Sequence, residues 1–196
     1  MGTLEISLLG GFQLRRAGTL LEPIALRAGR SLLAYLVMNR ERPHTRDLLA
    51  GTFWPDLPDA RARRRLSQAL WHLQARLTPG EDAQRRLLAV AGDTVGISPA
   101  ADFWLDVDEF EWTLEQAAPG VVTSRSQEAD LLAAAVRLYR GDLLEGLYDD
   151  WAVPDRERLS ESFLRALERL TDLVMSRGDY ETALTHARRL AQAAPM

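Results

Sequence analysis

Residues 59–77 carry an uninterrupted amphipathic helical pattern, and this segment constrains the fold more than any other part of the 196-residue chain. At 3.6 residues per turn, its small and aliphatic residues fall on one stripe that can pack against other helices. That stripe consists of Ala62, Leu66, Ala69, Leu70, Leu73 and Leu77. The opposite side and its flanks are mostly basic or polar, and they consist of Arg61, Arg64, Arg65, Ser67, Gln68, Trp71, His72 and Ala75. Such a helix needs partner helices beneath it and presents a basic surface to its surroundings.

Shorter elements, separated by glycine and proline, precede this helix. Alternating apolar residues predict strands at 4–8 and 12–14 and an extended piece near 20–24. Apolar residues at helical spacing predict helices at 29–39 and 46–54. The long helix is therefore expected to be the third of three.

A predicted hairpin follows the third helix. Thr78-Pro79-Gly80 should stop the helix, and residues 87–90 and 94–97 should pair across the turn-forming Gly92-Asp93. Three helices followed by a hairpin are typical of a winged helix-turn-helix, in which the third helix reads the major groove of DNA and the hairpin touches the flanking backbone.

From Asp102 onward the pattern is helical, with helices expected at 128–139 and 159–176. Breaks are expected at Pro119-Gly120, Gly141, Gly146, Pro154 and Gly178. Gly178-Asp179-Tyr180, Ala183 and Pro195 match the turn, the close helix crossing and the late proline of a tetratricopeptide repeat. A plain helical bundle would use the same apolar spacing. We predict a mainly α chain with a winged helix-turn-helix domain of α and β structure at 1–99 and an all-α, tetratricopeptide-like domain at 102–196.

The charge of the chain changes sign at its middle. Residues 1–100 carry a balance of +5 and residues 101–196 a balance of −9, within a net charge of −4. A basic half attracts the phosphate backbone of nucleic acid, whereas an acidic half is repelled by it. The two halves are therefore expected to have different partners.

The basic face of residues 60–77 supplies the predicted DNA contacts. Arginine can bind phosphate or guanine, and glutamine can pair with adenine. The predicted contacts on this recognition helix are Arg64, Arg65, Ser67, Gln68, Trp71 and His72. Such a face can also be merely solvated, with Asp56 and Asp59 as local ion-pair partners. Trp71 is expected to pack on a thymine methyl group or a sugar, or to dock on the wing.

Further predicted contacts lie near the starts of the first two helices, where backbone N–H groups favour phosphate. They are Arg27, Arg30, Thr45 and Arg46, with Thr45 also expected to cap the second helix, and Thr94 is added on the wing. The wing tip itself is a weak candidate because Asp93 would repel phosphate.

Nothing in the sequence points to an enzyme. The chain has no cysteine, no phosphate-binding loop, and no nucleophile beside a base. His44, His72 and His186 lie in different elements, which argues against a metal site, and His44 is expected in a loop. The carboxylate pairs Asp106/Asp108 and Asp149-Asp150 are interpreted as loop or cap residues. We therefore expect no cofactor and no metal.

No membrane segment is expected either. The longest apolar run, residues 32–38, is too short to span a bilayer, and the N-terminus lacks the pattern of a signal peptide. These features favour a cytoplasmic location.

An ordered set of motifs resembles the SARP-type bacterial transcriptional activators, which join an OmpR-like winged helix to a bacterial transcriptional activation domain. The matching stretches cover nearly the whole chain. They are Arg27–Leu36, Arg46–Asp56, Ala62–Leu73, Leu138–Gly146 and Trp151 with Arg156–Leu159.

The resemblance implies sequence-specific binding to double-stranded promoter DNA, commonly at direct repeats, and recruitment of RNA polymerase. In this sequence we expect no receiver domain before the winged helix. Relatives often continue into an ATPase or sensor module, and this chain stops one residue after Pro195, at the close of a repeat, so a fragment of a longer protein is expected. Many relatives carry a basic residue in the wing where this chain has Gly92-Asp93-Thr94.

We predict a DNA-binding transcriptional regulator of the activator type, whose acidic half forms a homodimer or contacts RNA polymerase. The alternative is a protein-interaction module or scaffold that does not bind DNA.

Overall fold

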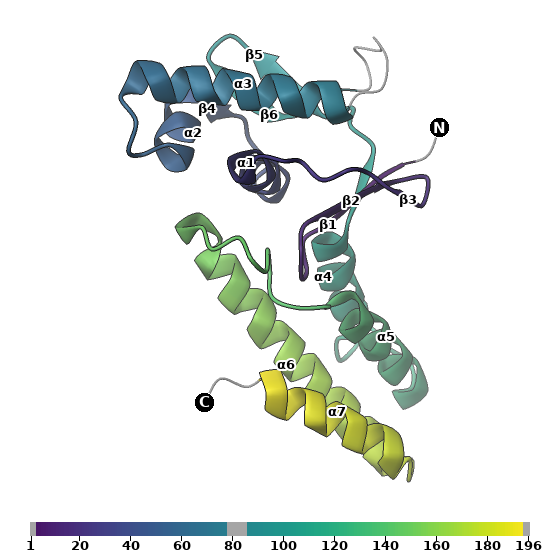
Figure 1. Ribbon diagram of the computed structural model, residues 1–196. Helices are drawn as coiled ribbons and strands as arrows, with labels where there is room; N and C mark the ends of the chain where they lie inside the picture. The colour runs from purple at the N-terminus through teal and green to yellow at the C-terminus, as the bar shows by residue number, and fades with distance from the viewer. Residues whose placement is uncertain (1–2, 78–85, 194–196) are drawn as a thin grey trace. The chain divides into compact units, whose positions relative to one another are not determined.

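The computed structural model describes residues 3–77 and 86–193 (Figure 1). The chain divides into two compact units. The first unit is Met1–Leu4 with Leu14–Phe103, and the second unit is Glu5–Gln13 with Trp104–Met196. The domain boundaries expected from the sequence remain a prediction, and this division differs from them in grouping residues 5–13 with the helical half.

The described residues of the first unit form three helices, α1 (Arg27–Met38), α2 (Arg46–Phe53) and α3 (Asp59–Leu77). Apolar residues of α1 lie in the core of this unit, including Leu32, Leu33, Leu36 and Val37. The stripe predicted on α3 is confirmed, because the same six residues are its buried ones. The basic face of α3 is thereby left on the surface of this unit.

Two small β structures complete the first unit. Strands β2 (Gln13–Arg16) and β3 (Thr19–Leu20) pair antiparallel, with Arg15 opposite Leu20. The second sheet has the order β4-β6-β5 and consists of β4 (His44–Thr45), β5 (Leu88–Ala91) and β6 (Thr94–Ile97). The β5–β6 hairpin follows the three helices in sequence, as predicted, and Gly92 adopts a φ of +56° in its turn. This unit is a winged helix-turn-helix.

Strand β4 corrects the expectation that His44 lies in a loop. His44 pairs with Val95 of β6 and is buried. Its Nε2 donates to the Asn39 carbonyl at 3.0 Å, and its ring meets Tyr35 edge-on at 5.0 Å between centroids. A two-residue strand has no periodicity of its own and depends on its distant partner, so the local sequence does not reveal it.

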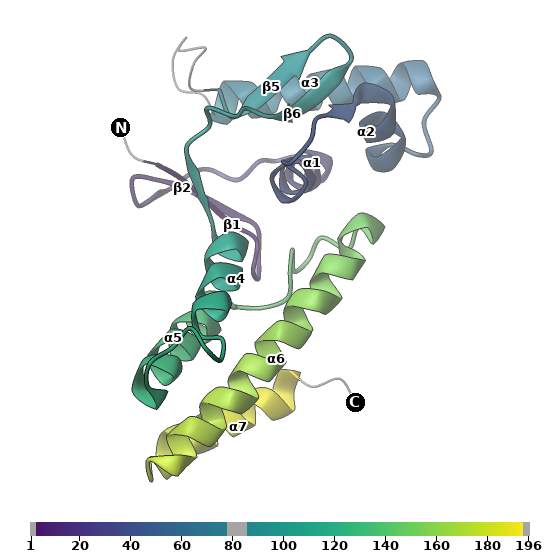
Figure 2. The same ribbon diagram turned by 180° about the vertical axis from the view of Figure 1, so that it is seen from behind.

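The second unit is built mainly from successive helices, together with β1 (Leu4–Ser7), β7 (Phe103–Leu105) and a short 3-10 turn at Asp150–Ala152. The helices are α4 (Asp106–Gln116), α5 (Arg125–Leu138), α6 (Val153–Ser176) and α7 (Tyr180–Ala193). Figure 2 shows α6 and α7 side by side. The rings of Tyr139 and Phe163 stack in this unit, with centroids 4.3 Å apart and planes 9° apart.

The predicted helical hairpin at the C-terminal end is confirmed within the described residues. Gly178 has a φ of +78° between α6 and α7, a conformation that glycine adopts easily, and Ala183 is buried at the crossing. Pro195 and Thr78-Pro79-Gly80 lie outside the described residues, although α3 ends at Leu77 where the sequence predicted.

One expectation for this half is wrong. Residues 103–105 form a strand rather than part of a helical pattern. The break expected at Pro154 coincides with the start of α6, because this proline lies in the first turn, where no intrahelical bond from its missing N–H is needed. In the described parts of the chain, no helix is both long and apolar enough to cross a membrane.

Candidate nucleic-acid interface

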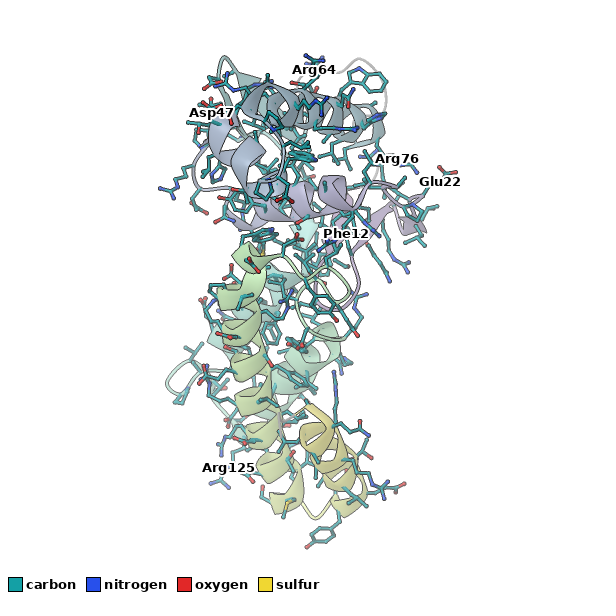
Figure 3. All side chains as sticks on the ribbon, turned by 60° about the vertical axis from the view of Figure 1, so that its left-hand side comes forward. Phe12, Glu22, Asp47, Arg64, Arg76 and Arg125 are labelled. Carbon is teal, nitrogen blue, oxygen red and sulfur yellow. The ribbon has the colours of Figure 1, made fainter. Side chains whose placement is uncertain are left out.

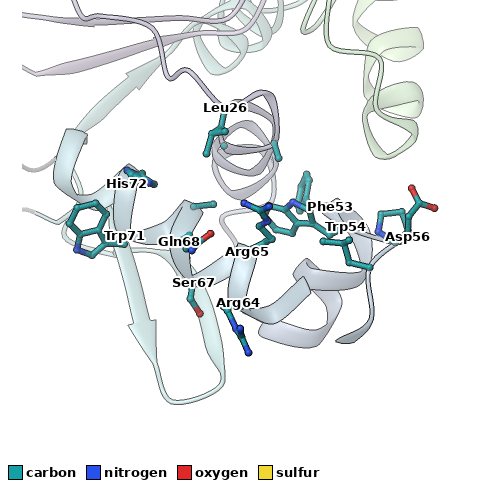
Figure 4. Close-up of a pocket in the computed structure, with 15 residues that line it drawn as sticks. Leu26, Phe53, Trp54, Asp56, Arg64, Arg65, Ser67, Gln68, Trp71 and His72 are labelled. Carbon is teal, nitrogen blue, oxygen red and sulfur yellow. The ribbon is translucent and has the colours of Figure 1, made fainter. Parts of the chain in front are cut away.

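A groove of about 980 Å³ runs along the exposed side of α3 in the first unit. Its walls also come from the start of α1 and from the end of α2 with the following loop (Figure 4). The six residues predicted on the recognition helix all line it: Arg64, Arg65, Ser67, Gln68, Trp71 and His72. The structure therefore places in one groove the six side chains that the helical spacing predicted on one face.

The arginines of α3 differ in their partners. Arg63 Nη2 lies 2.5 Å from Asp47 Oδ1. Arg76 Nη2 lies 2.8 Å from Glu22 Oε2, and Figure 3 labels Arg76 and Glu22. In residues 3–77 and 86–193, no carboxylate forms an ion pair with Arg64 or Arg65, and Asp56 and Asp59 form none with this face. Arg64 and Arg65 are both exposed. Their charges are available to an anionic ligand.

Trp71 and His72 form an exposed aromatic pair beside these arginines. Their rings meet edge-on with centroids 4.9 Å apart, and Trp71 is 65% exposed. This exposure does not fit docking of Trp71 on the wing. Together the two rings offer a ligand apolar area with polar N–H groups at its edge.

Arg46 links α2, α3 and the wing. Its Nη1 donates to Ser67 Oγ at 3.1 Å, and its backbone N–H donates to the carbonyl of Asp93 at 2.9 Å. Ser67 in turn donates its hydroxyl hydrogen to the Arg63 carbonyl at 3.0 Å. Ser67 can therefore serve a ligand only as an acceptor while these bonds persist. The same bonds tie the recognition helix to the hairpin turn.

Thr45 and Thr94 are register partners in β4 and β6. Thr45 Oγ1 accepts from the Leu48 N–H at 3.3 Å and so caps α2, as predicted. Thr94 Oγ1 donates to the Ala91 carbonyl at 2.9 Å and is half-buried. Both hydroxyls have structural roles, and their contacts with phosphate stay predictions.

Arg27 and Arg30 lie in the first turn of α1, but neither lines the groove. Arg27 is exposed. Arg30 is half-buried, and its Nε is buried without a hydrogen-bond partner in the part of the chain that the structure describes. Leu26, Ala28 and Gly29 do line the groove. Arg27 and Arg30 are therefore sequence neighbours of groove residues.

Trp54 is a groove residue that was not among the predicted contacts. It is the C-cap residue directly after α2 and is half-buried, and its ring meets that of Phe53 edge-on with centroids 6.2 Å apart. Its place directly before Pro55, at the turn into the third helix, was the available signal. Asp56 also lines the groove and can accept a hydrogen bond from a base amino group.

The groove offers guanidinium, amide and aromatic groups but no catalytic or metal-binding set. Within the described residues, no group of three or more His, Asp or Glu side chains is placed to hold a metal ion. The chemistry of the lining is that of recognition: charge for phosphate, hydrogen-bonding groups for base edges and an apolar ring for methyl groups or sugars.

Comparison with known protein families adds a match in the other half of the chain. Residues 105–196 match the family described as the bacterial transcriptional activator domain. This range begins at the last residue of β7 and includes all four helices of the second unit.

Named relatives and a solved structure agree with this match. The transcriptional regulatory protein EmbR of Mycobacterium tuberculosis is 30% identical over 147 residues, which cover 74% of this chain and 37% of EmbR. EmbR of Mycobacterium bovis gives the same values. The structure of M. tuberculosis EmbR in complex with a low-affinity phosphopeptide aligns with a TM-score of 0.77 and 26% identity, over 97% of this chain and 50% of that one. The chain spans little more than a third of the length of these curated relatives.

Proposed function

We propose that this chain, which belongs to the SARP-type bacterial transcriptional activators as its motifs predicted, binds promoter DNA by placing α3 in the major groove. The observation that carries the proposal is the groove along α3. There, two exposed arginines without carboxylate partners in the described residues lie beside Gln68 and an exposed tryptophan. Arginine can donate to both acceptors of a guanine edge, and glutamine can donate to N7 of adenine while accepting from its N6 amino group.

Each side chain has a distinct proposed task. Arg64 and Gln68 read bases, and Trp71 with His72 packs on a thymine methyl group or a sugar. Arg27, Arg30 and Arg46, together with Thr45 and Thr94, fix the register on phosphates. Arg46 has guanidinium N–H groups beyond the one that holds Ser67, so it can bind phosphate without releasing α3.

The acidic helical half is proposed to act after DNA binding. DNA repels a region of net negative charge, so we expect this half to bind a protein, either RNA polymerase or a second copy of this chain. Binding to spaced direct repeats would place copies side by side on the promoter. Such a regulator would work in the bacterial cytoplasm. In a transcription assay with purified bacterial RNA polymerase, the chain should raise transcript yield from a promoter that it binds, and an unchanged yield would contradict the activation step.

The DNA-binding proposal is tested with a randomised duplex pool. The purified chain is equilibrated with the pool across a salt series, and the bound fraction is sequenced. We expect an enriched motif and an affinity that falls steeply with salt, by a log–log slope of about −0.9 for each phosphate neutralised. Spaced repeats within the motif would support tandem or dimeric binding.

Two results would contradict the proposal. Binding that depends on salt but enriches no motif would reduce the α3 face to a nonspecific electrostatic surface. No binding at low salt would favour the alternative of a protein-docking module, to which the acidic Asp93 at the wing tip and Asp56 in the groove are better suited.

A further inference from the structure

Residues 5–10 are packed into the second unit, although they lie almost 100 residues before it in the sequence. The side chains of Ile6, Leu8 and Leu9 are fully buried. Leu143 and Leu144, on the loop after α5, are fully buried as well. The N-terminal segment thus supplies part of the apolar core of the helical unit.

The carboxylate of Asp106 holds this segment by its backbone. Asp106 Oδ1 accepts from the Leu8 N–H at 2.8 Å, and Oδ2 accepts from the Leu9 N–H at 3.0 Å. Arg140 Nη2 donates to the same Oδ2 at 3.1 Å. The Asp106 side chain is 1% exposed, and burial raises its pKa while these hydrogen bonds oppose the rise. The expectation of a loop or cap carboxylate here is wrong, because both oxygens bind a distant stretch of backbone.

The loop after α5 holds the other edge of the segment. Leu9 bridges antiparallel to Leu143. The Leu144 N–H donates to the Leu8 carbonyl at 2.8 Å, and the Glu145 N–H donates to the Gly10 carbonyl at 3.0 Å. In return, the Gly10 N–H donates to the Asp142 carbonyl at 3.0 Å. Residues 8–10 therefore have strand-like bonds to residues 142–145.

Two glycines allow the close approach of these segments. A Cβ on Gly141 would lie 3.3 Å from Gly10 Cα and 2.5 Å from Glu145 Oε2. Gly10 has a φ of +95°, a conformation that side chains disfavour. A larger residue at either position would strain the pairing or push the segments apart.

We infer that the activator domain of this chain is a strand-binding domain, and that residues 6–10 occupy its site within the same chain. The ligand class is an extended peptide with two adjacent apolar residues followed by glycine, bound by main-chain hydrogen bonds as in β-strand addition. Asp106 and the loop at 140–145 form the site. The domain is therefore built from two separate pieces of chain, and a version starting at residue 102 lacks its own strand.

This inference explains the motif at residues 138–146, which has no role in the proposed DNA recognition. In the stretch from Tyr139 to Glu145, Tyr139 donates its hydroxyl to Asp142 Oδ1 at 2.9 Å, and Arg140 pairs with Asp106. Arg156 donates from Nε to the Leu143 carbonyl and from Nη2 to the Leu147 carbonyl, both at 3.0 Å. These bonds shape the loop that receives the N-terminal segment. The inference does not depend on DNA binding.

The test uses the full chain with a protease recognition sequence inserted after Gly11. Gly11 is exposed and has no atom within 4 Å of the position that a Cβ would take, so we expect the chain to accommodate an insertion there. After cleavage, only noncovalent contacts hold the N-terminal fragment. We expect the fragment to co-elute with the remainder in gel filtration and native mass spectrometry. Its release, with the helical circular dichroism of the remainder retained, would overturn the inference.

Asp106→Ala should weaken retention of the cleaved fragment by at least about tenfold, because two buried N–H groups lose their acceptor. Glu115→Ala is the matched control, since Glu115 is an exposed carboxylate on the same helix. Equal retention in the two variants would overturn the assignment of Asp106. A synthetic peptide of residues 3–11 should displace the fragment, whereas the same peptide with Gly10→Val should not.

A second measurement needs neither cleavage nor a folded alanine variant. In uncut Asp106→Asn, the Leu8 and Leu9 amides should exchange hydrogen at least about tenfold faster than in the unmodified chain. Amides in the middle of α6 should keep their protection. Unchanged exchange at Leu8 and Leu9 would contradict the inference.

Discussion

The two units use the same residue type, arginine, in opposite ways. On α3 of the first unit, Arg64 and Arg65 are exposed and lack a carboxylate partner among the described residues. In the second unit, Arg156 and Arg189 are half-buried and donate to backbone carbonyls. Arginine on α3 is therefore available for a ligand, whereas these arginines of the helical unit hold the fold.

The partners of Arg189 show why the second use is structural. Its two Nη groups donate to the Val136 and Tyr139 carbonyls at the C-terminal end of α5, where helix carbonyls lack internal partners. Its guanidinium lies 4.8 Å over the Phe163 ring, and burial lowers its pKa. A side chain fixed in this way stabilises a helix end. Substitutions in the two units should accordingly differ in what they change: affinity in the first and stability in the second.

The largest effect on stability is expected at Arg156. Arg156→Ala removes two charge-assisted hydrogen bonds to the Leu143 and Leu147 carbonyls and should lower the free energy of unfolding by about 3 kcal/mol. Urea denaturation followed by circular dichroism measures this loss. Arg165→Ala is the control, because its exposed ion pair with Glu161 should be worth at most about 0.5 kcal/mol. Equal losses would remove the distinction drawn for the second unit.

The next effect separates two neighbours on α3. Arg64→Ala should weaken binding to the selected duplex by about 2 kcal/mol and reduce the salt slope by about 1 if Arg64 also meets phosphate. Arg63→Ala should cost less, because Arg63 is already paired with Asp47. Fluorescence anisotropy at several salt concentrations measures both. A larger loss of DNA affinity for Arg63→Ala than for Arg64→Ala would contradict the assignment of the DNA contact to the groove-lining face of α3.

A smaller effect should appear at acid pH in the second unit. The hydrogen bond from Arg169, with its charge, lowers the pKa of Glu128 below its ordinary value of 4.5. The stability that this pair contributes is therefore present above pH 4.5 and is lost as the pH falls through the lower pKa of the folded state. Glu128→Gln should flatten the acid side of a profile of thermal stability against pH. An unchanged profile would show that the pair does not contribute.

The smallest effect concerns His186 on α7. Burial lowers its pKa below 6.5, the nearby Arg189 lowers it further, and Asp179 opposes the change. Above pH 6.5 the imidazole is neutral in both states, so stability should fall only as the pH drops below 6.5, where the unfolded chain takes up the proton first. His186→Asn should remove this part of the pH dependence. A dependence of the same size in that variant would assign it to another group.

Local periodicity was sufficient for the long helices and for the candidate interface. The buried stripe and the groove-lining face of α3 follow from 3.6-residue spacing alone, because a helix fixes which side chains share a side. Features set by distant partners were missed. His44 is a strand residue because it pairs with Val95. Asp106 can be buried because its oxygens accept hydrogen bonds from the N–H groups of Leu8 and Leu9. Pro154 was a usable boundary signal, because proline fits the first turn of a helix and α6 begins there.

The most direct test of this account measures DNA affinity and the unfolding midpoint on the same two variants. Arg64→Ala should lose affinity for the selected duplex and keep its urea midpoint. Arg156→Ala should show a lowered midpoint and, at urea concentrations where it remains folded, unchanged affinity. The account would be contradicted if Arg64→Ala bound DNA as tightly as the unmodified chain, or if its main effect were on unfolding.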